Sequence, residues 1–256
     1  MDKTTSADGT AIAYEKAGSG PLIVFVAGAF NDHHRLAPLA SALSADHTTV
    51  VYDRRGRGES GDAAAYAIER EVDDLAAVIA AAGGRASVFG YSSGGVIALL
   101  AATRLELDHL FLFEAPFAGP DRPHAHDLPG RMQAMVDDGR PGDAVATFQL
   151  EGIGLPPHVV EQIKQSPLWP GLVAMAQATV YDAIITTELA QPTAEMLAVS
   201  VPTVVMVGAD TMPVLKEAAK LVPVGEYAEV AGGANHDVPV EETARLIRAR
   251  LSVNNP

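Results

Sequence analysis

The chain has 256 residues, of which 48% are hydrophobic and 20% are charged, and its formal net charge is −14 at pH 7. This acidic balance argues against a nucleic-acid-binding protein, because phosphates require a basic surface. The chain contains no cysteine, which excludes disulfides, thiolate metal sites and a cysteine nucleophile.

The hydropathy of the sequence does not indicate a membrane protein. No stretch approaches the roughly 20 apolar residues that span a bilayer. Residues 1–9 are polar, with no apolar run of signal-peptide length. We therefore expect a soluble, cytoplasmic protein that binds neither membranes nor nucleic acid.

The predicted elements begin with a β-hairpin over residues 3–17, whose Asp8-Gly9 pair suits a tight turn. Continuous apolar runs, typical of strands covered on both faces, follow at residues 22–26, 48–52, 86–89, 110–113 and 203–207. Apolar residues at helical spacing lie between them, at residues 36–43, 72–79 and 96–102. This alternation predicts an α/β fold with a doubly wound, mostly parallel sheet.

The alternation stops in the second quarter of the chain and resumes later. Residues 119–191 contain prolines and helix-like segments but no strong β run. After them a strand and helix rhythm returns and ends in a helix over residues 241–251. We predict a core domain formed by residues 1–118 and 192–256, with residues 119–191 inserted as a helical cap.

A candidate nucleophile lies in Gly90-Tyr91-Ser92-Ser93-Gly94, which matches G-x-S-x-G. An apolar strand run precedes this pentapeptide and a helix-like run follows it, which is the context of a nucleophile elbow. The small residues let neighbouring backbone pass close, and the helix N-terminus directs its free N–H groups at the serine. We predict that Ser92 is a nucleophile; the alternative is an ordinary helix-capping serine.

A serine hydroxyl needs a base and the base needs a carboxylate. His236 follows a strand-like run and lies in a loop before the last helix, and an imidazole can accept a proton at neutral pH. Asp210 and Glu114 each follow an apolar strand run. We favour Asp210, because it gives the chain order Ser, Asp, His, and keep Glu114 as the alternative acid.

These motifs together resemble those of the α/β-hydrolase superfamily, in the group that carries a helical cap. Residues 90–95 are similar to the family's nucleophile motif, residues 52–60 to its D-x-R-G-x-G-x-S turn, and Asn235-His236 to its histidine loop. The resemblance implies a catalytic triad and an oxyanion hole formed by the backbone amides of Ala29 and Ser93. It implies no cofactor.

Four side chains are candidates for a substrate pocket: Phe30, His33, Tyr91 and Trp169. The alternative for His33 is a helix-start histidine on a solvated face, and the alternative for Trp169 is packing of the cap helices on one another. We predict no metal site. The expected partner is a small-molecule substrate, and the sequence does not indicate an oligomeric state.

The resulting hypothesis is a cofactor-independent serine hydrolase, carboxylesterase-like, that cleaves a small or medium, largely apolar ester or related acyl substrate through an acyl-enzyme. Relatives with this type of cap also cleave C–C bonds, hydrolyse lactones or act as cofactor-free haloperoxidases (perhydrolases) with the same triad. A third alternative is a non-catalytic small-molecule-binding protein on the same fold.

Overall fold

A single eight-stranded sheet forms the centre of the molecule in the computed structural model, which describes residues 1–63, 65–119 and 126–252. The strands are β1 (Asp2–Thr5), β2 (Ala11–Gly18), β3 (Leu22–Val26), β4 (Thr48–Tyr52), β5 (Ala86–Tyr91), β6 (Leu107–Phe113), β7 (Thr203–Asp210) and β8 (Glu226–Ala234). Their order across the sheet is β1-β2-β4-β3-β5-β6-β7-β8. β1 and β2 pair antiparallel, β2 pairs antiparallel with β4, and the pairs from β4 to β8 are parallel.

Both faces of the sheet are buried, as the unbroken apolar runs predict. In β3, Val24 and Val26 belong to the apolar cluster on one face, whereas Ile23 and Phe25 belong to the cluster on the other. Neighbouring residues of a strand point to opposite faces, so a strand covered on both sides needs apolar residues at every position.

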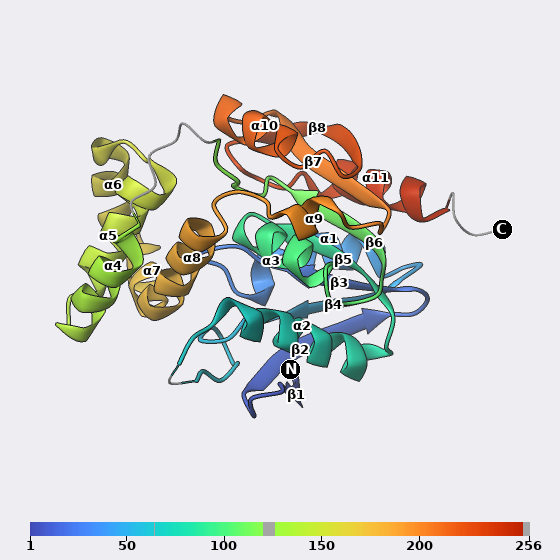
Figure 1. Ribbon diagram of the computed structural model, residues 1–256, viewed down its shortest axis with the longest axis horizontal. Coiled ribbons are helices and arrows are strands. Elements are labelled where there is room, and N and C mark those ends of the chain that lie inside the picture. The colour runs from blue at the N-terminus through green and yellow to red at the C-terminus, as the bar shows by residue number, and fades with distance from the viewer. Residues whose placement is uncertain (64, 120–125, 253–256) are drawn as a thin grey trace.

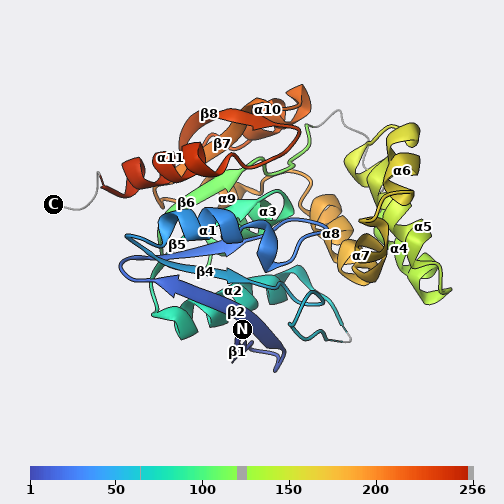
Figure 2. The ribbon, with the colours of Figure 1, turned by 180° about the vertical axis from the view of Figure 1, so that it is seen from behind.

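Helices cover both faces of the sheet, with α2 and α3 in front and α1 and α11 behind it (Figures 1 and 2). The helices outside the predicted cap are α1 (Ala37–Leu43), α2 (Ile68–Ala82), α3 (Ser93–Ala101), α9 (Ala194–Leu197), α10 (Pro213–Lys220) and α11 (Val240–Ser252), with a short 3-10 turn, η1 (His33–Arg35). The doubly wound α/β prediction is confirmed. None of the helices in the described ranges is both long and apolar enough to cross a bilayer.

The described residues 126–191, between β6 and β7, are largely helical, and their helices lie to one side of the sheet (Figure 1). These helices are α4 (Leu128–Asp137), α5 (Pro141–Thr147), the π-helical turn η2 (Phe148–Ile153), α6 (Pro157–Lys164), α7 (Trp169–Ala174) and α8 (Ala176–Glu188). A small apolar cluster joins α4, α5 and α8. We keep the name cap for residues 119–191; these boundaries stay a prediction, and residues 120–125 lie outside the described part of the chain.

Candidate active site

Ser92 lies in the sharp turn between β5 and α3. Its backbone has φ 56° and ψ −129°, a conformation that costs of order 1–3 kcal/mol for a residue with a side chain. A Cβ on Gly94 would lie 2.3 Å from the Val26 carbonyl oxygen. One on Gly28 would lie 2.6 Å from the Ser92 Cβ. Glycine at these two positions therefore allows β3 and the turn to pack closely around the serine.

Ser92 and His236 line the same cavity, which has a volume of about 360 Å³. Four other residues predicted for the site also line it: Ala29, Phe30, Tyr91 and Ser93. Much of the remaining wall is apolar and comes from the cap, from the segment after β6 and from the start of α10: Pro116, Ala118, Leu128, Phe148, Ile153, Leu155, Pro156, Met212, Val214 and Leu215. Residues far apart in the sequence thus meet at the carboxyl ends of the parallel strands, where ligands bind in this type of sheet.

The carboxylate that contacts His236 belongs to Glu114, directly after β6. Its Oε2 is hydrogen-bonded to Nδ1 of His236, and its Oε1 accepts a hydrogen bond of 2.9 Å from the backbone N–H of Gly208. Burial alone would raise the pKa of Glu114, but the hydrogen bonds from His236 and Gly208 hold it below its usual range. Because an ionised carboxylate only accepts, the proton of this hydrogen bond belongs to Nδ1 of His236.

The expectation that Asp210 contacts His236 is therefore corrected. Asp210 is exposed and is the last residue of β7, where it pairs with Ala234 of β8. The strand runs three residues beyond the predicted apolar run, with a register shift between Gly208 and Asp210. This extension places Asp210 on the continuing strand, and the backbone of Gly208 supports Glu114 instead.

Backbone strain is concentrated around this cavity. Among the described residues, the non-glycine positions with positive φ are Phe30, Ser92, Glu114, Asn235 and His236. Three of them line the cavity, one is the carboxylate bound to the histidine, and the other precedes that histidine. Strained backbone that the fold nevertheless maintains is typical of functional sites.

Tyr91 fastens the histidine loop to the strand that precedes Ser92. Its hydroxyl donates a hydrogen bond of 2.7 Å to the carbonyl oxygen of His236. Burial raises the pKa of Tyr91, although the nearby Arg35 charge acts in the opposite direction, so the phenol keeps its proton and acts as the donor. Arg35 lies over the Tyr91 ring at 5.3 Å and bonds Asp237 at 2.7 Å. The loop is thus anchored at His236 itself and at the next residue, Asp237.

Two candidate pocket residues are not part of the cavity wall. His33 is buried, and its Nδ1 lies 2.7 Å from Oδ1 of Asp53, so it braces the loop behind the cavity. Trp169 begins α7, and its ring lies against α5, within 3.4 Å of where a Cβ on Gly142 would sit. Trp169 thus packs the cap helices, the alternative stated for it above, whereas His33 lies neither in the cavity wall nor on a solvated face.

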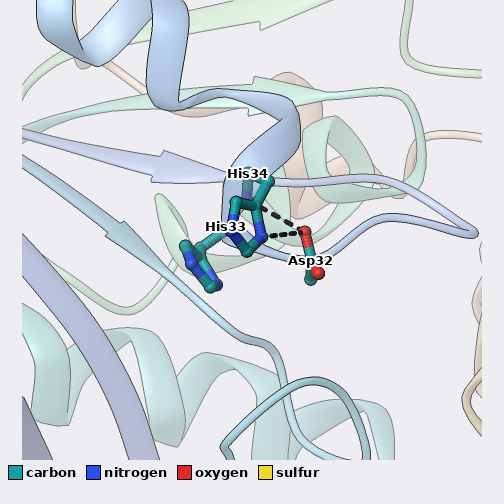
Figure 3. Close-up of side chains that lie close together, drawn as sticks. All are labelled: Asp32, His33 and His34. Carbon is teal, nitrogen blue, oxygen red and sulfur yellow. Dashed lines mark hydrogen bonds and ion pairs between the residues drawn. The ribbon is translucent and has the colours of Figure 1, made fainter. Parts of the chain in front are cut away.

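Asp32, His33 and His34 lie together just before α1 and offer ligand atoms within 4.8 Å of one another (Figure 3). Both imidazoles already use Nδ1, that of His33 with Asp53 and that of His34 with Asp32 at 3.1 Å. Asp32 also caps the turn η1 by accepting from the backbone N–H of His34. The group is therefore explained as a helix-start cap, and the prediction of no metal site stays a prediction.

The fold and this cavity define the class of protein. The sequence pattern of the Alpha/beta hydrolase family matches residues 23–249, and the chain belongs to this family. An alpha/beta hydrolase from Sphaerobacter thermophilus DSM 20745 is 41% identical and superposes with a TM-score of 0.90, over 98% of this chain and 100% of that one.

Two further proteins are similar to this chain. The structure of a thermophilic esterase from Thermogutta terrifontis (malate bound) is 26% identical, with a TM-score of 0.72 over 98% of both chains. The uncharacterized hydrolase YraK of Bacillus subtilis (strain 168) is 38% identical over 139 residues, which is 52% of this chain and 51% of that protein. The match thus spans about half of this curated relative. These likenesses support a hydrolase and leave its substrate open.

Proposed function

We propose that the protein is a cofactor-independent serine hydrolase that cleaves a small or medium, largely apolar ester through an acyl-enzyme. The observation that carries the proposal is that Ser92 and His236 line one cavity while Glu114 holds the histidine from behind. Glu114 takes the place of Asp210 as the acid, and the chain order of nucleophile, acid and histidine is unchanged.

The reaction starts when Nε2 of His236 takes the hydroxyl proton of Ser92 and the serine Oγ attacks the ester carbonyl carbon. The developing oxyanion is stabilised by the backbone N–H groups of Ala29 and Ser93, which both line the cavity. Ser93 is the first residue of α3, so its N–H has no partner within the helix. The loss of one such donor typically costs about 10²–10³ in rate.

The tetrahedral intermediate then collapses. His236 gives its proton to the departing alkoxide, which leaves as the alcohol, and the acyl group stays on Ser92. A water molecule, deprotonated by the same imidazole, attacks the acyl-enzyme and releases the carboxylic acid with the free serine. Glu114 remains ionised throughout and stabilises the imidazolium.

The dimensions and chemistry of the cavity support the substrate class. Its volume of about 360 Å³ is near the lower end of the range for small-molecule sites, roughly 300–1,000 Å³. The cap side of the wall includes Phe148, which packs edge-on against Phe30 with ring centroids 5.8 Å apart. Glu151 and Thr187 are among the polar groups of the wall. A wall of this kind favours uncharged, compact acyl and alcohol groups.

The test uses a fluorophosphonate probe, which bonds covalently to activated serines, together with hydrolysis of p-nitrophenyl butyrate. We expect mass spectrometry to find the probe on Ser92, and Ser92→Ala and His236→Ala to lower ester turnover at least about 10³-fold. His34→Ala is the matched control, because the His34 side chain is 76% exposed and is not part of the cavity wall. This variant should leave the probe labelling and the ester hydrolysis unchanged.

A wild-type protein that neither takes the label nor turns over the ester would overturn the proposal. Ligand binding that persists in Ser92→Ala and His236→Ala, again without turnover, would identify the non-catalytic binding protein instead.

A further inference from the structure

Asp182, on cap helix α8, is completely buried between two arginines of the turn that follows β4. Its Oδ1 accepts from Nη1 of Arg54 at 2.9 Å, and its Oδ2 accepts from Nη2 of Arg57 at 2.6 Å. All three side chains are at most 1% exposed. The far side of Arg54 binds Glu71 through two hydrogen bonds, of 3.0 and 2.6 Å. A charged group so deeply buried is stable only when it is paired in this way.

Asp182 is ionised despite its burial. Desolvation alone would raise its pKa, but the charges of Arg57 and Arg54 and hydrogen bonds from Arg54 and Ser93 lower it. One carboxylate thus joins two guanidinium groups and one hydroxyl, and it belongs to the cap whereas its partners belong to the core.

The arginines that Asp182 holds also contact the loop after β3. Nη1 of Arg57 donates to the carbonyl oxygen of Gly28 at 2.8 Å, and Nη1 of Arg54 donates to that of Ala27 at 3.3 Å. The Gly28 carbonyl shares its peptide group with the N–H of Ala29. Because a trans peptide is planar and its C=O and N–H point in opposite directions, a guanidinium fixed on the Gly28 oxygen aims the Ala29 N–H the other way. The positive charge also polarises the peptide and strengthens that N–H as a donor.

The second predicted oxyanion donor is tied to the same carboxylate. The hydroxyl of Ser93 donates to Oδ1 of Asp182 at 2.8 Å, and the N–H of Ser93 is the other amide that lines the cavity. One buried group from the cap is therefore connected to both residues whose backbone N–H groups would bind the oxyanion, directly at Ser93 and through Arg57 at Ala29.

We propose that Asp182 is a positioning residue, which fixes the two oxyanion-binding amides and so makes cap helix α8 part of the catalytic machinery. The inference rests on the proposed function, because it assigns a role in forming the oxyanion. The inference predicts different effects on the chemical step and on substrate binding. Loss of Asp182 should leave the cavity wall in place, and so substrate binding, but should misdirect the N–H groups of Ala29 and Ser93, and so slow the chemical step.

The chain offers a matched control in a second buried pair, Arg55 and Asp74. These side chains form two hydrogen bonds of 2.7 Å and are both 0% exposed. Within the described part of the chain, neither Arg55 nor Asp74 lines the cavity or bonds the carbonyl groups of the loop after β3, as Arg54 and Arg57 do. Breaking this pair therefore reproduces the stability cost of breaking a buried ion pair without the positioning effect.

The experiment compares Asp182→Asn with Asp74→Asn, and Arg57→Lys with Arg55→Lys. The lysine variants keep the charge but lose the fork that bridges two acceptors, so they remain informative if an asparagine variant does not fold. For each variant we measure kcat and KM for p-nitrophenyl butyrate, the inhibition constant of an alkyl trifluoromethyl ketone, which forms an oxyanion with the active serine, and Tm by circular dichroism.

We expect Asp182→Asn and Arg57→Lys to lower kcat about 10- to 100-fold, since a displaced donor costs less than a deleted one. The ketone should bind more weakly by a similar factor, with KM changed less than about threefold. The control variants should lose Tm but keep kcat within about threefold. Equal losses of kcat in the two sets of variants, or a change confined to KM, would overturn the inference while the proposed function stands. An unreactive wild-type protein would overturn both.

Discussion

The ends of β6 and β7 both carry a carboxylate, yet only one of them reaches the histidine. β6 ends at Phe113, and the next residue, Glu114, turns the backbone with φ 49° and is 1% exposed. β7 continues to Asp210, because β8 stays paired with it through Ala234. The point at which each strand stops pairing therefore decides which carboxylate meets the histidine.

The β7 end nevertheless supports the site through its backbone. The N–H of Gly208 donates to Glu114, and a Cβ at Gly208 would lie 2.4 Å from the carbonyl oxygen of Gly233. A residue with a side chain at this position would push β7 and β8 apart just before the histidine loop. The end of β7, which was predicted to supply the acid, thus supplies a hydrogen bond that holds Glu114 and a close backbone contact that holds the histidine loop.

Substitution of the two carboxylates, Glu114 after β6 and Asp210 at the end of β7, should differ most in its effect on turnover. Glu114→Gln should lower kcat for p-nitrophenyl butyrate about 10³- to 10⁴-fold, because an amide cannot hold the histidine in the tautomer that leaves Nε2 as the base. Asp210→Asn should change kcat less than about threefold, because that side chain is exposed on the continuing strand. Steady-state kinetics of both variants decides the question. A severe loss in Asp210→Asn alone would restore the acid that the sequence favoured.

Features that depend on a short stretch of sequence could be predicted, whereas the carboxylate that contacts His236, which depends on the pairing of β7 with β8, could not. The turn that holds Ser92 can be predicted because a strand, a tight turn and a helix lie in one short window. The loop that holds His236 can be predicted because it lies between a strand and the last helix. The choice between the two acids depended on where β7 stops, which is set by its register with β8. An apolar run does not reveal this register, because the extra residues of β7 are not all apolar.

The same limit applies to the residues behind the cavity. The arginine turn at residues 53–60 indicates the fold, but Asp182 lies 128 residues after Arg54, and nothing in its own helix marks it as a partner. The one signal in the sequence is that Asp182 lies in the middle of α8 among largely apolar residues, whereas the other acidic residue, Glu188, ends the helix; an acid buried among apolar residues requires a counter-charge. His33 likewise has its partner, Asp53, on another strand end. Only the folded chain shows that it braces the loop and does not line the cavity.

A second expected difference between the strand ends is in stability and its dependence on pH. The folded-state pKa of Glu114 is below its usual range, so the ionised group stabilises the fold above the ordinary glutamate pKa of about 4.3. This contribution is lost as the pH falls through the lower folded-state pKa. Glu114→Gln should therefore lower the free energy of unfolding by about 1.5–3 kcal/mol at pH 7.

The gap between Glu114→Gln and the wild-type protein should narrow as the pH is lowered below about 4, where the carboxyl group becomes neutral like the amide. Urea denaturation at a series of pH values measures it, with Asp210→Asn as the control that should stay close to wild type at pH 7. A gap that is constant over the whole range would mean that the charge of Glu114 does not contribute to stability.

The smallest expected effect concerns the loop that faces the two strand ends. Tyr91→Phe removes the hydrogen bond to the carbonyl oxygen of His236, and the loss should cost about 0.5–1.5 kcal/mol in the free energy of unfolding. Because Asn235 and His236 both have positive φ, a loop with one anchor fewer should hold the imidazole less well, and kcat should fall about three- to tenfold. Tyr227→Phe is the matched control, since that exposed hydroxyl bonds only Glu229 among the described residues. Equal kcat values for the two variants would show that Glu114 alone is sufficient to orient His236. The hydrogen bond from Tyr91 would then contribute nothing to the orientation of the imidazole.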